Sequence, residues 1–180
     1  MRAYYFDNLS GDQRLPHDYD PSRPVSPETL ASLNIKHWTI PVLGHEEKVD
    51  AIAKERGYKN RDTINVSREG MGEIYEEKIK GFFQEHMHED EEIRYILSGS
   101  GFFDVRETPT DAWIRLAVEP GDLLVVPAGI YHRFTLDEKD NIKALRLFKD
   151  EPKWVPHNRG PETDVNPHRI GYLKTINVGA

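Results

Sequence analysis

The chain has 180 residues with a net charge of -7, 31% charged and 10% aromatic residues, and no cysteine. This length suits one domain with a full hydrophobic core, and the aromatic content argues against disorder. The negative net charge argues against the basic surface that a nucleic-acid-binding protein needs. No apolar run approaches the roughly 20 residues of a membrane-spanning helix. The lack of cysteine excludes disulfides and a thiol nucleophile. We therefore expect a single domain over residues 1–180, with no nucleic-acid partner and no membrane insertion.

The first 85 residues are expected to form loops, short strands and helices. Ser26 as N-cap and Pro27 at the first helical position predict a short helix that ends near Leu33. Apolar residues at helical spacing predict a second helix over 46–56, which Gly57 ends. Short strands are expected at 3–6, 35–40 and 63–66.

A third helix is expected over 73–85, directly before His86. Its apolar side chains at helical spacing form a stripe that ends in Phe82 and Phe83. Packing in the core is the expected role of at least one of these two rings. The helix would deliver the chain straight into the first histidine of the candidate site.

Residues 86–150 are expected to form a barrel, because short strands and turn residues alternate throughout this part of the chain. The strands are predicted at 93–97, 101–106, 113–118, 122–126, 132–135 and 142–148. Such a set must hide its edges, which favours a closed or sandwiched antiparallel barrel. The predicted fold class is mainly β with flanking helices.

Residues 151–180 are expected to be a packed, extended tail rich in proline, glycine and asparagine. Trp154 and Tyr172 are the predicted anchors, and a last strand is expected near 172–176. Surface or packing roles are expected for the histidines outside the candidate site, which are His17, His37, His45, His157 and His168.

Four side chains form a candidate metal site. His86 and His88 lie two residues apart, so in a strand both imidazoles point to one face. Glu92 can reach that face if the acidic residues before it make a bend, and His132 can join from a neighbouring strand. Three imidazoles and a carboxylate without thiolate suit a divalent ion such as Fe, Ni, Mn or Co. The alternative is that the two histidines are simply exposed, beside a run of solvent-exposed acidic residues. The histidines lie on strands that are bounded by turn glycines, and this context favours the metal site.

Strand alternation places two arginines on the same face as the metal. Arg94 lies two residues after Glu92 and therefore on the same face of its strand. Arg146 shares one face of its strand with Ala144 and Phe148, which are expected to line the interior. A guanidinium inside a small barrel is costly unless it meets an anion. That anion is either Glu92 or another carboxylate in a structural ion pair, or an anionic substrate. Two arginines beside a metal favour the substrate.

The stretches 85–95 and 127–134 resemble the paired signature motifs of the cupin superfamily. The resemblance implies a cupin-type antiparallel β-barrel, the double-stranded β-helix or jelly roll. Two departures exist, because Gly81 lies one residue closer to the first histidine than is usual and Leu136 replaces an asparagine found in many cupins. Neither departure touches a ligand.

A larger part of the chain is similar to the acireductone dioxygenase family, and most of all to its eukaryotic, fungal members. The similar segments span nearly the whole chain and are 23–25, 85–88, 91–97, 99–106, 127–135, 144–148 and 151–154. The resemblance implies an enzyme of methionine salvage that combines O2 with the acireductone 1,2-dihydroxy-3-keto-5-methylthiopentene. With Fe(II) the family forms 4-methylthio-2-oxobutanoate and formate. With Ni(II) it forms 3-methylthiopropionate, formate and CO.

The same resemblance implies roles for individual residues and cofactors. The cofactor would be Fe(II) or alternatively Ni(II), with Mn or Co as substitutes in vitro. The metal ligands would be His86, His88, Glu92 and His132. Arg94 would be catalytic and would bind substrate together with Arg146, Phe82, Phe148 and Trp154.

The expected chemistry needs no protein nucleophile. Four protein ligands leave two positions on an octahedral ion, which the enediol oxygens of the substrate can occupy while Arg94 holds the substrate as an anion. These ligands do not choose between Fe and Ni.

Two rival functions stay open at this point. One is a cupin that binds a small molecule or a partner through a structural metal without turnover, and the other is a metal-dependent isomerase or a cupin dioxygenase with a different substrate.

The sequence also gives expectations for the cellular location and the oligomeric state. Asp7 ends the only apolar run near the start, which predicts no secretory signal. We expect the protein in the cytoplasm, with the nucleus as a second location. We also expect a monomer, because the sequence shows no long apolar seam.

Overall fold

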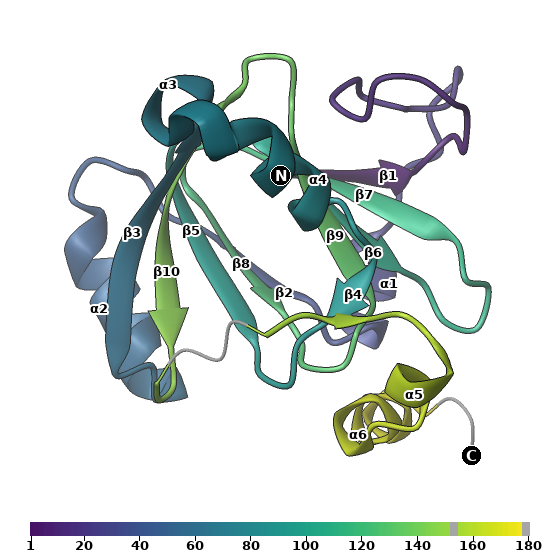
Figure 1. The fold of residues 1–180 in the computed structure, drawn as a ribbon. Coiled ribbons are helices and arrows are strands. Elements are labelled where there is room, and N and C mark those ends of the chain that lie inside the picture. Colours follow the sequence, from purple (N-terminus) through teal and green to yellow (C-terminus); the bar gives the residue numbers. More distant parts are fainter. Residues whose placement is uncertain (152–154, 178–180) are drawn as a thin grey trace.

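Two antiparallel β-sheets face each other in the computed structural model of the chain, which describes residues 1–151 and 155–177 (Figure 1). The six-stranded sheet has the order β1-β7-β6-β9-β4-β11, and the five-stranded sheet has the order β2-β8-β5-β10-β3. All of these neighbours pair in antiparallel fashion. This is the sandwiched antiparallel barrel that the sequence predicts.

The strand bounds agree closely with the turn signals in the sequence. Three of the six predicted barrel strands match to the residue, and the other three are longer by at most two residues at either end. The six-stranded sheet contains β1 (Arg2–Tyr5), β4 (His86–Met87), β6 (Gly101–Arg106), β7 (Trp113–Val118), β9 (His132–Leu136) and β11 (His157–Asn158). The five-stranded sheet contains β2 (Lys36–Thr39), β3 (Asn60–Ser67), β5 (Glu92–Gly99), β8 (Asp122–Val126) and β10 (Asn141–Phe148).

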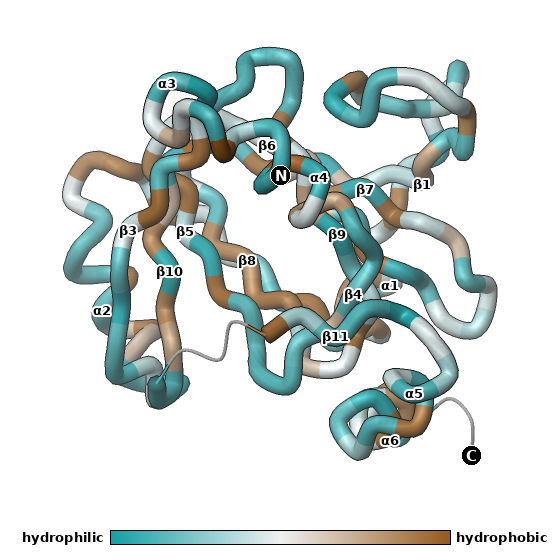
Figure 2. Tube along the Cα trace, viewed as in Figure 1, coloured by the Kyte–Doolittle hydropathy of each residue, from teal (hydrophilic) through white to brown (hydrophobic). Residues whose placement is uncertain are grey.

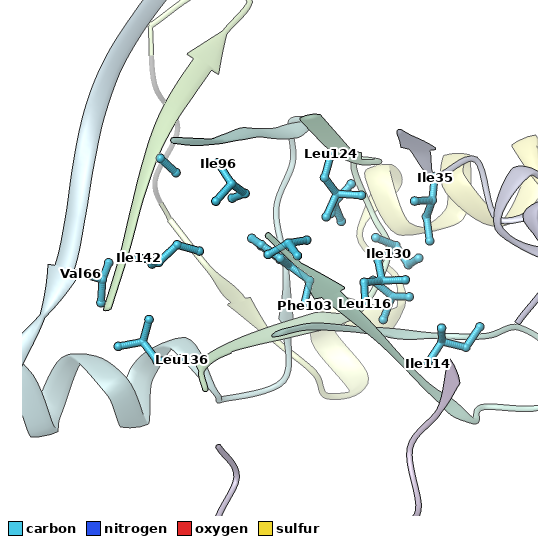
Figure 3. Close-up of a cluster of buried hydrophobic side chains, with 14 of the residues drawn as sticks. Ile35, Val66, Ile96, Phe103, Ile114, Leu116, Leu124, Ile130, Leu136 and Ile142 are labelled. Atoms are coloured by element: carbon cyan, nitrogen blue, oxygen red, sulfur yellow. The ribbon is translucent and has the colours of Figure 1, made fainter. Parts of the chain in front are cut away.

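The main hydrophobic core lies between the two sheets. Figure 3 shows Ile96 and Leu124 of the five-stranded sheet beside Phe103 and Leu116 of the six-stranded sheet. Burying one such side chain stabilises the fold by about 1.5–3 kcal/mol relative to an exposed one. In Figure 2 the central strands carry most of the hydrophobic residues, whereas the connecting loops are mostly hydrophilic. The core therefore fixes the spacing of the sheets, and with it the distance between residues that face each other across them.

A second core covers the outer face of the five-stranded sheet. Ile93 and Tyr95 of β5 pack there against Val49 and Ala53 of α2 (His45–Arg56). These two β5 residues alternate with the ones that face the interior, as the period of a strand requires. The opposite face of β5 is thus left for the candidate site.

The first two helices begin and end where the sequence predicts. Ser26 caps α1 (Pro27–Ser32) by accepting a hydrogen bond from Thr29 N, and Gly57 ends α2 in a left-handed conformation with φ 75°. No helix in the described part of the chain is long and apolar enough to cross a membrane.

The third helix is shorter than predicted: α-helix occupies only residues 75–82 of the expected range 73–85, and three short pieces cover residues 68–82. They are α3 (Arg68–Met71), the 3-10 turn η1 (Gly72–Ile74) and α4 (Tyr75–Phe82), which lie across one end of the sheets (Figure 1). Ser67 caps α3 by accepting from Gly70 N, and Gly72 ends it with φ 59°. Gly72 thus separates α3 from the later pieces, and the apolar stripe of the predicted helix lies on α4, which ends at Phe82.

The tail is helical, so the strand predicted near 172–176 is wrong. It forms β11, α5 (Pro161–Asp164) and α6 (Pro167–Thr175), and the two helices follow β11 at the bottom of Figure 1. The Asn166 side chain accepts from His168 N and Pro167 occupies the first turn, so the start signal of a helix is present. Tyr172 is buried, as its predicted role as an anchor requires, whereas Trp154 lies outside the described residues.

A buried charge cluster anchors β9 from the outer side of its sheet. Asp104 of β6 accepts from Arg115 of β7 and from Arg133 of β9, at 2.8–2.9 Å. Arg115 also donates to two backbone carbonyls of the loop 10–24, which covers this face. Because Asp104 and Arg115 are fully buried, each compensates the charge of the other. His132, which precedes Arg133, therefore sits on a strand that is fixed from behind.

Candidate metal centre

Three histidines from separate positions in the chain meet at one point between the sheets. His86 and His132 begin β4 and β9, and the antiparallel register places them directly opposite each other. His88 follows β4 immediately. Each of the three imidazoles offers a nitrogen, and all three nitrogens lie within 4.8 Å of one another. Ligand nitrogens at this spacing can surround a single ion.

The fourth predicted ligand reaches the same point from the other sheet. The chain bends at residues 89–90 after His88, and Glu92 then begins β5. Its Oε2 lies 2.8 Å from His132 Nε2 and 3.6 Å from His88 Nε2. The bend therefore brings the carboxylate onto the face that both histidines share.

The hydrogen bonds of the imidazoles orient their free nitrogens toward the centre. In each ring Nδ1 lies against a backbone carbonyl, at 2.5 Å for His86 and Gln84, 3.3 Å for His88 and Val155, and 3.0 Å for His132 and Ile130. A carbonyl can only accept, so these contacts favour a proton on Nδ1, and a ring without a second proton then presents an Nε2 lone pair to the centre. Three imidazole nitrogens and a carboxylate that converge on one point can hold a cation. Nitrogen and oxygen ligands of this kind fit a divalent first-row metal.

The electrostatics favour the protonation states that bind metal. Burial lowers the pKa of His86 to about 4, with a further contribution from the charge of His132, and burial also lowers the pKa of His88. Burial by itself would raise the pKa of Glu92, but Arg94 and the hydrogen bond with His132 outweigh it and hold that pKa well below its usual range. The two imidazoles are thus neutral and the carboxylate ionised near pH 7, as metal coordination needs.

Both predicted arginines face the cavity beside the ligands. Arg94 Nη2 lies 3.1 Å from Glu92 Oε1, and the register of β5 and β10 places Arg94 opposite Arg146. Arg146 forms two hydrogen bonds of 2.7 and 2.8 Å with Asp62 of β3. The prediction from strand parity is confirmed, and each guanidinium also has the carboxylate partner that the alternative interpretation required.

The cavity has a polar end and an apolar end within a volume of about 150 Å³. The polar end holds the four candidate ligands and the two arginines. The apolar end is lined by aliphatic and aromatic side chains, which are Ile64, Val66, Phe82, Ile96, Phe103, Phe134, Ile142 and Ala144. Such a shape accepts a small molecule with a charged head and an apolar tail.

The aromatic residues that were predicted to line the pocket lie in different places. Phe82 lines the cavity and packs edge-on against Phe134 with ring centroids 6.1 Å apart, whereas Phe83 turns away and lies under Arg133. Phe148 is half-buried at the end of β10 and is not among the described residues of the cavity lining. Trp154 belongs to the part of the chain that is not described.

Among the residues of the site that the sequence did not predict are two aromatic lining residues and one supporting carboxylate. Phe134 lies two residues after His132, so strand alternation could have placed it on the metal's face. Phe103 lies opposite Phe134 in the β6–β9 register, which the sequence does not reveal. Asp62 shares its face of β3 with Ile64, but the predicted strand began at residue 63.

Comparisons with known proteins agree with this geometry. The model of the ARD/ARD' family matches residues 2–156. Acireductone dioxygenase 1 of the fungus Coprinopsis cinerea is 69% identical over 180 residues, which are 100% of both chains. Acireductone dioxygenase of Aspergillus fumigatus is 56% identical over 176 residues, covering 98% of this chain and 97% of its own. The structure of acireductone dioxygenase from Bacillus anthracis with a cadmium ion in its active centre has a TM-score of 0.65 at 24% identity, covering 77% of this chain and 94% of its own.

Proposed function

Because the chain belongs to the ARD/ARD' family, we propose that it is a metal-dependent acireductone dioxygenase of the methionine salvage pathway. The substrates are 1,2-dihydroxy-3-keto-5-methylthiopentene and O2. One observation supports this function above others: a cluster of three imidazoles and a carboxylate lies beside two arginines at the polar end of a cavity whose other end is apolar. A binding module without turnover would not need this combination.

The proposed metal ligands are His86, His88, Glu92 and His132. The metal is Fe(II) or alternatively Ni(II), with Mn or Co able to replace them in vitro, and when bound it supplies a Lewis acid and a template for the substrate. The protein holds the imidazoles in one tautomer through their backbone carbonyl partners. The cadmium ion of the Bacillus anthracis relative supports a metal in the corresponding fold.

Arg94 is the proposed catalytic residue and binds the substrate together with Arg146. An acireductone is an enediol that ionises readily, so its oxygens carry negative charge at neutral pH. Charge-assisted hydrogen bonds from a guanidinium hold such an anion and fix its orientation. Arg94 is the better placed of the two because it also contacts Glu92. No side chain of the cavity is needed as a nucleophile.

The apolar end of the cavity is the proposed site of the methylthio tail. Phe82 and Phe134 offer ring edges and faces, with which a thioether sulfur packs favourably. Phe148 and Trp154 are also proposed to bind the substrate, as the family resemblance implies. Burial of an uncharged tail there leaves the reactive oxygens at the polar end.

Turnover with separately loaded metals tests this function. Metal-free protein is reloaded with Fe(II) or Ni(II) and given the acireductone, and O2, formate and CO are followed. We expect rapid O2 consumption with both metals, 4-methylthio-2-oxobutanoate and formate from the Fe(II) form, and 3-methylthiopropionate, formate and CO from the Ni(II) form. Free metal without protein controls for spontaneous oxidation. Metal uptake without turnover would leave a metal-binding module in place of the enzyme.

Residues 1–180 are proposed to act as one domain and as a monomer, in the cytoplasm with the nucleus as a second location. The exposed large apolar side chains support a monomer, because they come from separate loops and helices; they are Leu9, Leu15, Leu43, Ile74, Val155, Val165 and Ile170. Sedimentation velocity is expected to show one species near the chain mass of 20.8 kDa. A species of twice that mass would contradict it.

A further inference from the structure

The helical tail contacts both segments that carry the candidate ligands, although its strand β11 and both of its helices lie beyond the residues 2–156 that match the family model. Its strand β11 pairs with β4, with Asn158 opposite His86. Just before β11, the carbonyl of Val155 accepts the hydrogen bond from His88. Figure 1 shows α5 and α6 following β11, below β4 in the view. The tail is therefore placed to influence the metal centre.

Gly129, which lies three residues before His132, connects the tail to two of the candidate ligands, His88 and His132. Gly129 N donates to the carbonyl of His88 at 3.0 Å, and Gly129 O accepts from Arg169 Nη1 of α6 at 3.0 Å. The next carbonyl along the chain, that of Ile130, orients His132. Gly129 has φ 86°, and a Cβ there would collide with the His168 carbonyl, so α6 packs directly on this backbone.

Arg169 is an unusual residue for a purely structural contact. It is 8% exposed, and its guanidinium lies over the rings of Tyr131 and Tyr172 at 4.4 and 5.7 Å. Within the described ranges it has no carboxylate at ion-pair distance, and the Gly129 carbonyl is its one hydrogen-bond acceptor. Burial accordingly lowers its pKa. Burying a charge in this way is costly, and a well-packed apolar side chain would stabilise the fold more.

We propose that Arg169 is a positioning residue for the metal centre. By holding the Gly129 carbonyl, it fixes the loop 127–131 against His88 and sets the orientation of the His132 imidazole. This inference rests on the proposed metal site, since it concerns how two of its ligands are held. Groups that orient metal ligands from outside commonly change metal affinity by about 10–100-fold when they are removed.

Three full-length variants test the proposal with Mn(II) as the probe. Arg169→Met removes the charge and the donors but keeps the apolar stem, Arg169→Lys keeps a charge and a donor, and Lys174→Met removes an exposed charge from the same helix. Calorimetric titration of the metal-free proteins is expected to show about 10–100-fold weaker binding for Arg169→Met. Arg169→Lys is expected to recover most of the affinity, and Lys174→Met to match the wild type. The visible spectrum of the Co(II) form should shift only in Arg169→Met.

The possible results separate this inference from the function on which it rests. Wild-type protein that binds no Mn(II) overturns the proposed metal site. Wild-type binding together with an Arg169→Met affinity within about twofold, and an unchanged Co(II) spectrum, overturns the role of Arg169 alone.

One further measurement needs no variant, in case Arg169→Met does not fold. If the tail helps to position the ligands, metal binding must in turn stabilise the tail, because coupling between two sites is reciprocal. Hydrogen exchange of wild-type protein is expected to slow in α6 when Mn(II) is added, and to stay unchanged in α2 on the outer face of the other sheet. Unchanged exchange in α6 would contradict the proposal.

Discussion

His132→Ala is expected to abolish metal binding and turnover while the fold persists. His132 Nε2 is one of three imidazole nitrogens at the centre and lies 2.8 Å from Glu92 Oε2, so the loss of this ring leaves two imidazoles and one carboxylate. The affinity for Mn(II) should fall by more than about 100-fold, beyond the usual effect of removing a group that only orients a ligand. Titration of the metal-free variant measures this loss, and an O2 electrode measures turnover.

The fold is expected to survive this substitution because the cores do not depend on His132. The apolar clusters on both faces of β5 lack this residue, and Arg133 stays tied to Asp104 behind it. Circular dichroism should therefore match the wild type. His37→Ala is the control, since His37 contacts Asp122 and lies outside the cavity lining. A His132→Ala protein that keeps wild-type affinity for Mn(II) would refute the assigned ligand set.

Much of the fold could be predicted because its signals are local. Turn glycines and prolines set the strand bounds within a residue or two, and Ser26 and Gly57 marked the ends of helices correctly. Strand alternation extended this to the site: once Glu92 faces the metal, Arg94 must face the same cavity. Parity on one strand needs no knowledge of its neighbours, which is why it succeeded.

The errors arise where contacts between distant segments decide the structure. Asp62 holds Arg146 across the β3–β10 pair, which joins residues 84 apart in sequence. Nothing near either residue reveals that pairing. Arg169 likewise contacts Gly129 only because α6 packs on the loop 127–131, which precedes His132.

The tail shows a different kind of error. Asn166 and Pro167 carry an ordinary helix start, but the surrounding proline, glycine and asparagine suggested an extended chain. Composition averages over many residues, whereas a cap acts through one hydrogen bond at a defined position. The cap was therefore the better indicator of structure in this segment.

Arg94→Met is expected to retain metal but lose turnover, which separates the two roles that its position allows. If Arg94 only compensates the charge of Glu92, its removal should weaken Mn(II) binding, because that carboxylate loses the cation that holds its pKa down most strongly. If Arg94 instead binds the anionic substrate, Mn(II) affinity should change by only a few fold while kcat falls by about 10²–10³-fold, as for other lost donors to a developing anion.

We expect the second result, because the four ligands themselves remain and a bound divalent ion replaces the charge of Arg94 beside Glu92. Mn(II) titration and steady-state O2 consumption, measured on the same preparation, decide between the two roles. Lys143→Met removes an exposed charge from β10 and should leave both quantities unchanged. Arg146→Met should lower turnover less than Arg94→Met, since Arg146 is already held by Asp62. Wild-type kcat in Arg94→Met would show that the guanidinium serves Glu92 and not the substrate.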